Sequence, residues 1–148
     1  AWVRQFGAFF LEVRPKELVG NVAAGSTDTG FILRPQLRKC QQGSSTMQRL
    51  APEDLNEAVA TVTGVFILGG CEQDCNACAQ ISGFAIWKSA HTGVITVDQT
   101  ANVRLDSLLL SDNHIGVALR FFRSRKDMSH RIFSHNVTVF GSTSASTC

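Results

Sequence analysis

The sequence lacks the signatures of several common protein classes. No apolar run approaches the roughly 18 residues that a membrane-spanning helix needs, and no succession at the start of the chain marks a signal peptide. The net charge of the 148 residues is only +2, which is too mild to indicate a nucleic-acid partner. The chain also has no phosphate-binding glycine loop and no serine–histidine–acid arrangement.

The apolar content of 44% is ordinary for a folded domain. The length and this composition predict that residues 1–148 form a single domain. The chain could also be an internal piece of a longer protein, in which case it is a fragment of such a domain. No cofactor is predicted for this chain.

A repeat marked by glycine is the main positive feature of the sequence. "FGAFF" (6–10), "TGFI" (29–32), "TGVF" (63–66), "TGVI" (92–95) and "HIGVA" (114–118) are versions of one element. Successive glycines differ in sequence number by 23, 34, 29 and 23: Gly7, Gly30, Gly64, Gly93 and Gly116. If the repeating unit is about 23 residues long, which is the shortest spacing, the two longer spacings imply two insertions. We place them at approximately 34–62 and 69–80. The first contains "APEDLNEAV", which is compatible with a short helix.

Each unit contains short stretches rich in Val, Ile and Phe that are broken by Gly, Ser, Asn and Asp, which is the pattern of strands and turns. No unit has a capped helical segment long enough to be the repeating element, and the leucine framework of leucine-rich repeats is absent. The sequence therefore predicts an all-β fold: a right-handed parallel β-helix, or solenoid, with coils of roughly 23 residues and two loop insertions. A β-sandwich with coincidental spacing is the alternative.

A constant shift of 23 in sequence number predicts which side chains stack on adjacent coils. The expected columns are Ile86, Leu109 and Ile132; Trp87, Leu110 and Phe133; Val94, Val117 and Phe140; Asn113 and Asn136; and His91 and His114. In this register Asp106 falls on Gly83 and Ser129, and Asp112 falls on Ser89 and His135. No carboxylate ladder forms, so we expect no catalytic residues and no enzyme activity. The histidine pair finds no third ligand in the register, so no metal site is predicted.

Several segments together resemble a known family. "FGAFFLEV", "GNVAAGS" with "TGF", "LNEAVATVTGVFIL", "ISGFAIWKSAHTGV", "DNHIGVALRFF" and "SHRIFSHNVTVFGS" are similar to the parallel β-helix region of the fibrocystin and fibrocystin-L family. The resemblance covers nearly the whole chain in the same order.

The resemblance implies a non-catalytic structural and recognition segment of a large, receptor-like cell-surface protein. Its location would be the extracellular face of the plasma membrane or a ciliary or stereociliary surface, or secreted if the chain is free. Membrane attachment would come only through segments outside this chain. The partner would be an extracellular protein or an anionic glycan, with no nucleic acid. The alternative is a carbohydrate-active β-helix protein that acts on hyaluronan-like polysaccharide.

Three cysteines lie close together in "CEQDCNAC" (71–78), with the C-x3-C-x2-C spacing that can also hold an iron–sulfur cluster or contribute to a zinc knuckle. The two insertions follow the same glycine-marked strand in successive coils, so Cys40 in the first can approach the cysteines of the second. In an extracellular protein, Cys40, Cys71, Cys75 and Cys78 are expected to form two disulfides. Three pairings are possible, and Cys148 is left unpaired or bonds outside the chain.

Two surface features are further candidates. The triplet Asn136-Val137-Thr138 is a glycosylation sequon, with Asn136 as the acceptor. The segment 120–131 is basic and could present a strip to anionic glycans, although a solvated edge is the alternative. The strip consists of Arg120, Arg123, Arg125, Lys126 and Arg131.

Overall fold

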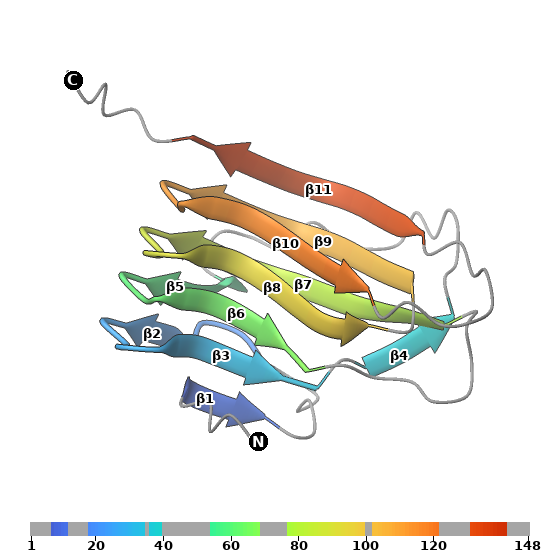
Figure 1. Ribbon diagram of the computed structural model, residues 1–148, viewed down its shortest axis with the longest axis horizontal. Coiled ribbons are helices and arrows are strands. Elements are labelled where there is room, and N and C mark those ends of the chain that lie inside the picture. The colour runs from blue at the N-terminus through green and yellow to red at the C-terminus, as the bar shows by residue number, and fades with distance from the viewer. Residues whose placement is uncertain are drawn as a thin grey trace.

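The computed structural model of the chain is built from strands that lie in two sheets (Figure 1). It describes residues 7–11, 18–34, 36–39, 54–68, 77–99, 102–121 and 131–141. Sheet A contains β1 (Gly7–Leu11), β3 (Thr29–Leu33), β6 (Thr63–Ile67), β8 (Thr92–Gln99) and β10 (Ile115–Phe121), in that order. Sheet B contains β2 (Val22–Ala24), β5 (Asn56–Val59), β7 (Ala77–Trp87), β9 (Asn102–Ser111) and β11 (Ile132–Phe140), with β4 (Gln36–Lys39) beside β7.

The chain alternates between the two sheets. Each strand of sheet A is followed by a strand of sheet B, and we call each such pair a coil, from coil 1 (β1 and β2) to coil 5 (β10 and β11). Neighbouring strands are parallel in both sheets, except that β4 runs antiparallel to β7. The fold is therefore all-β, with parallel strands in two sheets that share one core.

The connections differ between the two edges of the coils. Those from sheet B to sheet A have three or four residues: 25–28, 60–62, 88–91 and 112–114. Those from sheet A to sheet B range from two residues (100–101) to twenty-two (34–55, which includes β4). We call the first the turn edge and the second the connection edge. The expectation that the two insertions emerge side by side is confirmed, because both lie on the connection edge and β4 pairs with β7.

Left-handed backbone conformations recur at fixed levels of the coils. One set opens the turn edge, at Gly25, Ala60, Lys88 and Asp112. A second set lies within sheet B, at Gly83, Ser107 and Asn136, and bends the long strands β7, β9 and β11. Asn136 therefore stands level with Ser107, whereas the constant shift had placed it level with Asn113. Asparagine tolerates this conformation better than most residues do.

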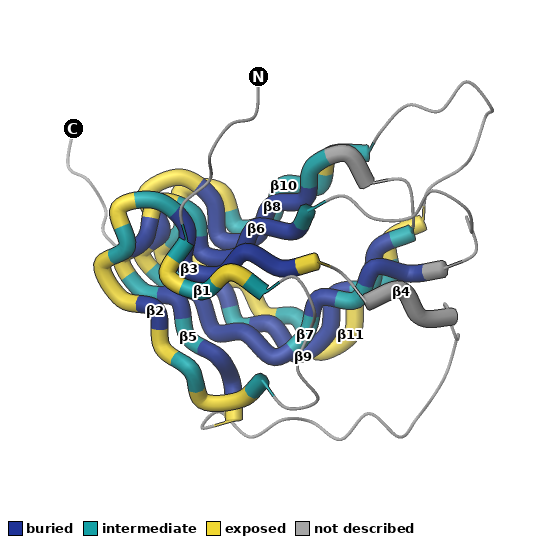
Figure 2. Tube along the Cα trace, turned by 90° about the horizontal axis from the view of Figure 1, so that it is seen from below, coloured by how far each residue is buried: buried dark blue, intermediate teal, exposed yellow. Residues whose placement is uncertain are grey.

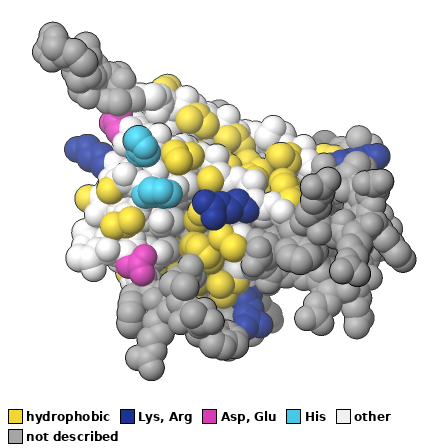
Figure 3. Space-filling model, viewed as in Figure 1, with side chains coloured by type: hydrophobic (Ala, Val, Ile, Leu, Met, Phe, Trp, Pro, Cys, Tyr) yellow, Lys and Arg dark blue, Asp and Glu magenta, His cyan; other side chains and the backbone are white. Residues whose placement is uncertain are grey.

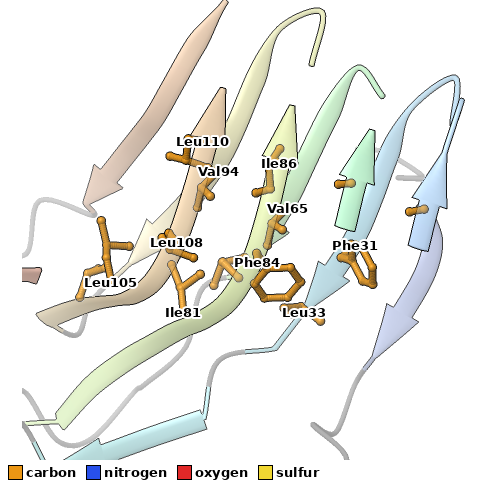
Figure 4. Packing of buried hydrophobic residues seen from close by; sticks show 14 residues of the cluster. Phe31, Leu33, Val65, Ile81, Phe84, Ile86, Val94, Leu105, Leu108 and Leu110 are labelled. Atoms are coloured by element: carbon orange, nitrogen blue, oxygen red, sulfur yellow. The ribbon is translucent and has the colours of Figure 1, made fainter. Parts of the chain in front are cut away.

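The core fills the space between the sheets with aliphatic and aromatic side chains (Figure 4). Phe31 of β3 stacks on Phe9 of β1, with ring centroids 4.7 Å apart, and meets Phe84 of β7 edge-on at 5.3 Å. Val65 and Val94 continue the sheet A side of the core, while Ile86, Leu108 and Leu110 face them from sheet B. Figure 2 shows this buried interior between the two layers.

The glycine repeat corresponds to a real column in sheet A. Pairing of β3, β6, β8 and β10 puts Gly30, Gly64, Gly93 and Gly116 at one level, which confirms their spacings of 34, 29 and 23. A Cβ added to any of the first three would lie 2.7 Å from the carbonyl oxygen of the next glycine in the column. Glycine is needed because the backbones approach too closely for a side chain. Gly7 is out of register by one residue, since it pairs with Thr29.

The expected columns hold in sheet A but fail in sheet B. Val94 pairs with Val117, as predicted. Ile86, however, pairs with Leu110 and not with Leu109, which is half-buried on the other side of β9. The reason is that turn 88–91 is one residue longer than turn 112–114, so paired positions differ in sequence number by 24 in sheet B and by 23 in sheet A.

The last strand departs further from the predicted register. Connection 122–131 adds residues before β11, so Leu110 pairs with Val139, and Ile132 pairs with Val103 instead of Leu109. Phe133 pairs with Arg104, and Phe140 pairs with Ser111 instead of joining the column of Val117. A single period could not reproduce these pairs because the connection lengths differ from coil to coil.

The insertion boundaries were too wide. The range 34–62 includes β5, a regular member of sheet B, and the range 69–80 includes the first residues of β7. The helix considered within "APEDLNEAV" is also wrong for its described part, because Asn56–Val59 is a strand. The Asn56 side chain is buried there and donates to the carbonyls of Leu18 at 2.7 Å and Gly83 at 3.1 Å. These tertiary hydrogen bonds override the local preference for a helix.

Candidate functional site

A charged cluster lies on the outer side of sheet B. Val103 and Leu105 of β9 belong to the core, so strand alternation places Arg104 and Asp106 on the opposite face. The parallel pairing of β11 brings His135 directly opposite Asp106. Two adjacent strands from different coils therefore supply the cluster, and it depends on the register of coil 5.

Asp106 is the centre of the cluster and is only 2% exposed. Its Oδ1 lies 3.0 Å from Nδ1 of His135 and accepts a hydrogen bond from the Ser107 hydroxyl at 3.3 Å. Its Oδ2 lies 3.9 Å from a guanidinium nitrogen of Arg104. A buried carboxylate requires such partners, because an unpaired buried charge is strongly unfavourable.

The Asp106 carboxylate also orients the imidazole. An ionised carboxylate only accepts hydrogen bonds, so Nδ1 of His135 carries the proton that it donates to Asp106. The basic Nε2 is then left for solvent or a ligand, since the His135 side chain is 59% exposed. A histidine held this way can act as a general base, and Arg104 supplies positive charge beside it. The cluster contains one carboxylate, whereas the usual glycoside hydrolases need two.

Sequence reasoning missed this cluster because it stacked Asp106 on Ser129 and Asp112 on His135. Asp106 and His135 differ in sequence number by 29, the same spacing as between Gly64 and Gly93. The basic segment 120–131 was treated as part of a coil of the shortest length. If this segment is treated as a third long connection, a shift of 29 pairs Asp106 with His135.

His91 and His114 lie at the turn edge. Their predicted adjacency is confirmed, because the amide of Ile115 donates to the carbonyl of His91 at 2.9 Å and Thr92 pairs with Ile115. Both side chains are exposed. Within the described ranges, no group of three or more His, Cys, Asp or Glu residues could hold a metal ion.

Cys78 is buried near the start of β7, opposite Arg38 of β4, and is disulfide-bonded. The other four cysteines, Cys40, Cys71, Cys75 and Cys148, lie outside the described residues. Which of them is bonded to Cys78 therefore stays a prediction. A cysteine in a disulfide has no thiolate to offer a metal. Cys78 in this state is therefore not a ligand of an iron–sulfur or zinc site.

The predicted basic strip is described only at its two ends. Arg120, near the end of β10, and Arg131, just before β11, are both exposed. Their backbone amides donate to Thr96 Oγ1 at 3.1 Å and to Asn102 Oδ1 at 2.8 Å, so coil 4 positions both. Arg123, Arg125 and Lys126 lie outside the described residues. Asn136, the predicted glycosylation acceptor, is exposed on β11.

The described part of the chain has no helix long and apolar enough to span a membrane. Comparison with protein families, with curated proteins and with solved structures finds no match to this chain.

Proposed function

We propose that the chain is a right-handed parallel β-helix segment from the extracellular part of a fibrocystin-like cell-surface protein. Its role is structural and recognition-related: the coils form a rigid solenoid whose surface is presented to an extracellular protein or an anionic glycan. The strict alternation of parallel strands between two sheets supports the architecture. Right-handedness is the expected sense, because crossovers between parallel strands are nearly always right-handed.

The observation that carries the recognition role is the contrast between the two edges of the coils. The turn edge keeps three or four residues per connection, while the connection edge varies from two to twenty-two. Variable loops on a rigid scaffold are the usual place for binding residues. The exposed Arg120 and Arg131 stand on this edge, and a cationic edge suits sulfated or carboxylated glycans.

Two features support an extracellular location. Cys78 is disulfide-bonded, and disulfides persist mainly in oxidising compartments. Asn136 has an exposed side chain within its sequon, so a glycan could be attached there.

Binding to immobilised heparin tests the recognition role. We expect wild-type protein to elute with salt, and Arg120→Ala with Arg131→Ala to weaken binding by about tenfold, since each exposed ion pair contributes up to about 1 kcal/mol. Arg123→Ala with Arg125→Ala should act in the same direction. Lys88→Ala is the matched control, because it removes an exposed cation from the turn edge. Equal elution of all variants and the wild type would reject the glycan-binding strip.

A carbohydrate-active protein acting on hyaluronan-like polysaccharide is the second candidate, favoured by the Asp106–His135 pair beside Arg104. In that case His135 is the base and Arg104 faces the uronate carboxylate. The test is the size of hyaluronan after incubation with the wild type and with His135→Gln. Unchanged polysaccharide in the presence of the wild type rejects this candidate.

A further inference from the structure

The two histidines of the turn edge occupy consecutive places in one column. His91 ends turn 88–91, and His114 ends turn 112–114. Besides the Ile115–His91 hydrogen bond, the amide of His114 donates to the carbonyl of Ser89 at 3.3 Å. Parallel pairing in this register separates the two backbones by about 4.8 Å. Figure 3 shows two histidine side chains next to each other on the face that carries β8 and β10.

One of the two rings is anchored by a buried hydroxyl. Nδ1 of His91 lies 2.7 Å from Oγ1 of Thr92, a residue that is fully buried. In the tautomer whose Nδ1–H donates to Oγ1, the unprotonated Nε2 is left for a ligand on the exposed side. Metal-binding histidines almost always donate their second ring N–H to a carboxylate, a backbone carbonyl or water, which fixes the ring orientation. Oγ1 of Thr92 takes the place of that acceptor for His91.

Few charged side chains surround the histidine pair within the described residues. The next place in the column below His91 is Val62, which is apolar and exposed, and Asp28 follows in coil 2. The two turns themselves contribute one cation, Lys88, and one carboxylate, Asp112, both exposed. The two turns therefore add no net charge beside the histidines, and Asp28 adds one carboxylate two places down the column.

We propose that His91 and His114 form a two-imidazole site for a transition-metal ion of the Cu²⁺, Ni²⁺ or Zn²⁺ class, with water in the remaining positions. Imidazole suits these ions, and the affinity order places Cu²⁺ above Ni²⁺ and Zn²⁺. The ion bridges coil 4 and coil 5 and so stabilises the attachment of coil 5 to coil 4. The inference is independent of the proposed glycan recognition, because it concerns the opposite edge of the coils.

Calorimetric titration of the disulfide-intact protein with CuCl2 at about pH 7.5 tests the site, since metal binding requires neutral imidazole. We expect one bound Cu²⁺, and a loss of at least tenfold in affinity for His91→Gln and for His114→Gln. His135→Gln is the matched control, since it removes another exposed histidine and should leave the affinity unchanged. Circular dichroism of each metal-free variant shows whether it is folded.

Two additional measurements sharpen the result. Thr92→Val should weaken Cu²⁺ binding by about 10- to 100-fold, because it removes the contact that orients His91. Electron paramagnetic resonance of the one-to-one complex should show coupling to two imidazole nitrogens in the wild type and to one in either single variant. Absence of Cu²⁺ binding by the wild type, unchanged affinity in both histidine variants, or an equal loss in His135→Gln would overturn the proposal.

Discussion

Leu110 and Val139 are register partners in adjacent strands of sheet B, yet their surroundings differ completely. Leu110 of coil 4 is 0% exposed, whereas Val139 of coil 5 is 57% exposed. Both occupy the column that runs from Ala23 through Ala58 and Ile86. The difference arises because Leu110 has a described strand on each side and Val139 has one on one side only.

The contrast extends along the whole of β9 and β11. Most side chains of β9 are buried, while β11 is exposed at seven of nine positions and half-buried at the other two. In a stack of coils, burial comes from neighbours on both sides, so β11, with a described strand on one side only, buries less of its surface than β9. The Asp106–His135 contact adds a polar attachment of β11 to β9.

The largest expected difference between the coils comes from placing a charge in this column. Leu110→Asp should abolish cooperative folding, because the carboxylate would be buried without a partner. Val139→Asp should cost about 1 kcal/mol or less, since its carboxylate can reach water. Urea denaturation followed by circular dichroism measures both. Similar losses in the two variants would show that Val139 is as buried as Leu110.

The glycine column offers a second matched pair. A Cβ at Gly93 would lie 2.7 Å from the backbone oxygen of Gly116, while a Cβ at Gly116 would meet side-chain methyl groups, Val139 Cγ1 at 3.3 Å and Leu110 Cδ1 at 3.9 Å. We expect Gly93→Ala to reduce the free energy of unfolding by about 3 kcal/mol and Gly116→Ala by less than about 1 kcal/mol. Thermal unfolding distinguishes them. A greater loss for Gly116→Ala would contradict the assigned spacing of the coils.

The attachment of β11 can be measured with a double-mutant cycle on Asp106→Asn and His135→Gln. We expect a coupling free energy of about 1 kcal/mol, since a hydrogen bond to a charged group is strong but His135 is largely exposed. The control cycle pairs Asp106→Asn with His114→Gln, and its effects should be additive. Additivity in the first cycle as well would mean that the contact contributes nothing to holding β11.

The smallest effect concerns the left-handed residues. Ala60 has a φ of 51°, and replacing it with glycine should stabilise the protein by about 0.5–1 kcal/mol, because the strain of its Cβ is relieved. Asn136 has the same φ of 51° in coil 5, but Asn136→Gly should change little, since asparagine tolerates this region. Precise denaturant midpoints are needed. Destabilisation by Ala60→Gly would show that chain entropy outweighs the relief of strain.

The parts of the fold that could be predicted are those that the sequence records locally. Glycine is required wherever the backbones of sheet A approach, so Gly30, Gly64, Gly93 and Gly116 mark their own column regardless of the lengths between them. The adjacency of His91 and His114 followed from the same column. The constant shift of 23 puts Leu109 in the column of Ile86, whereas the structure puts Leu110 there. The two leucines are adjacent and of the same type, so only the one-residue difference between turns 88–91 and 112–114 decides which of them is buried.

The sequence by itself determined that strands recur and that β3, β6, β8 and β10 each carry a glycine at the same level. These properties depend on residue type and on short-range steric limits. Only the tertiary structure decided the register of sheet B, and with it the Asp106–His135 contact. The physical reason is that this register is the sum of all turn and connection lengths in a coil. One additional residue in a turn moves every later side chain of sheet B to a new partner, while the local strand pattern remains the same.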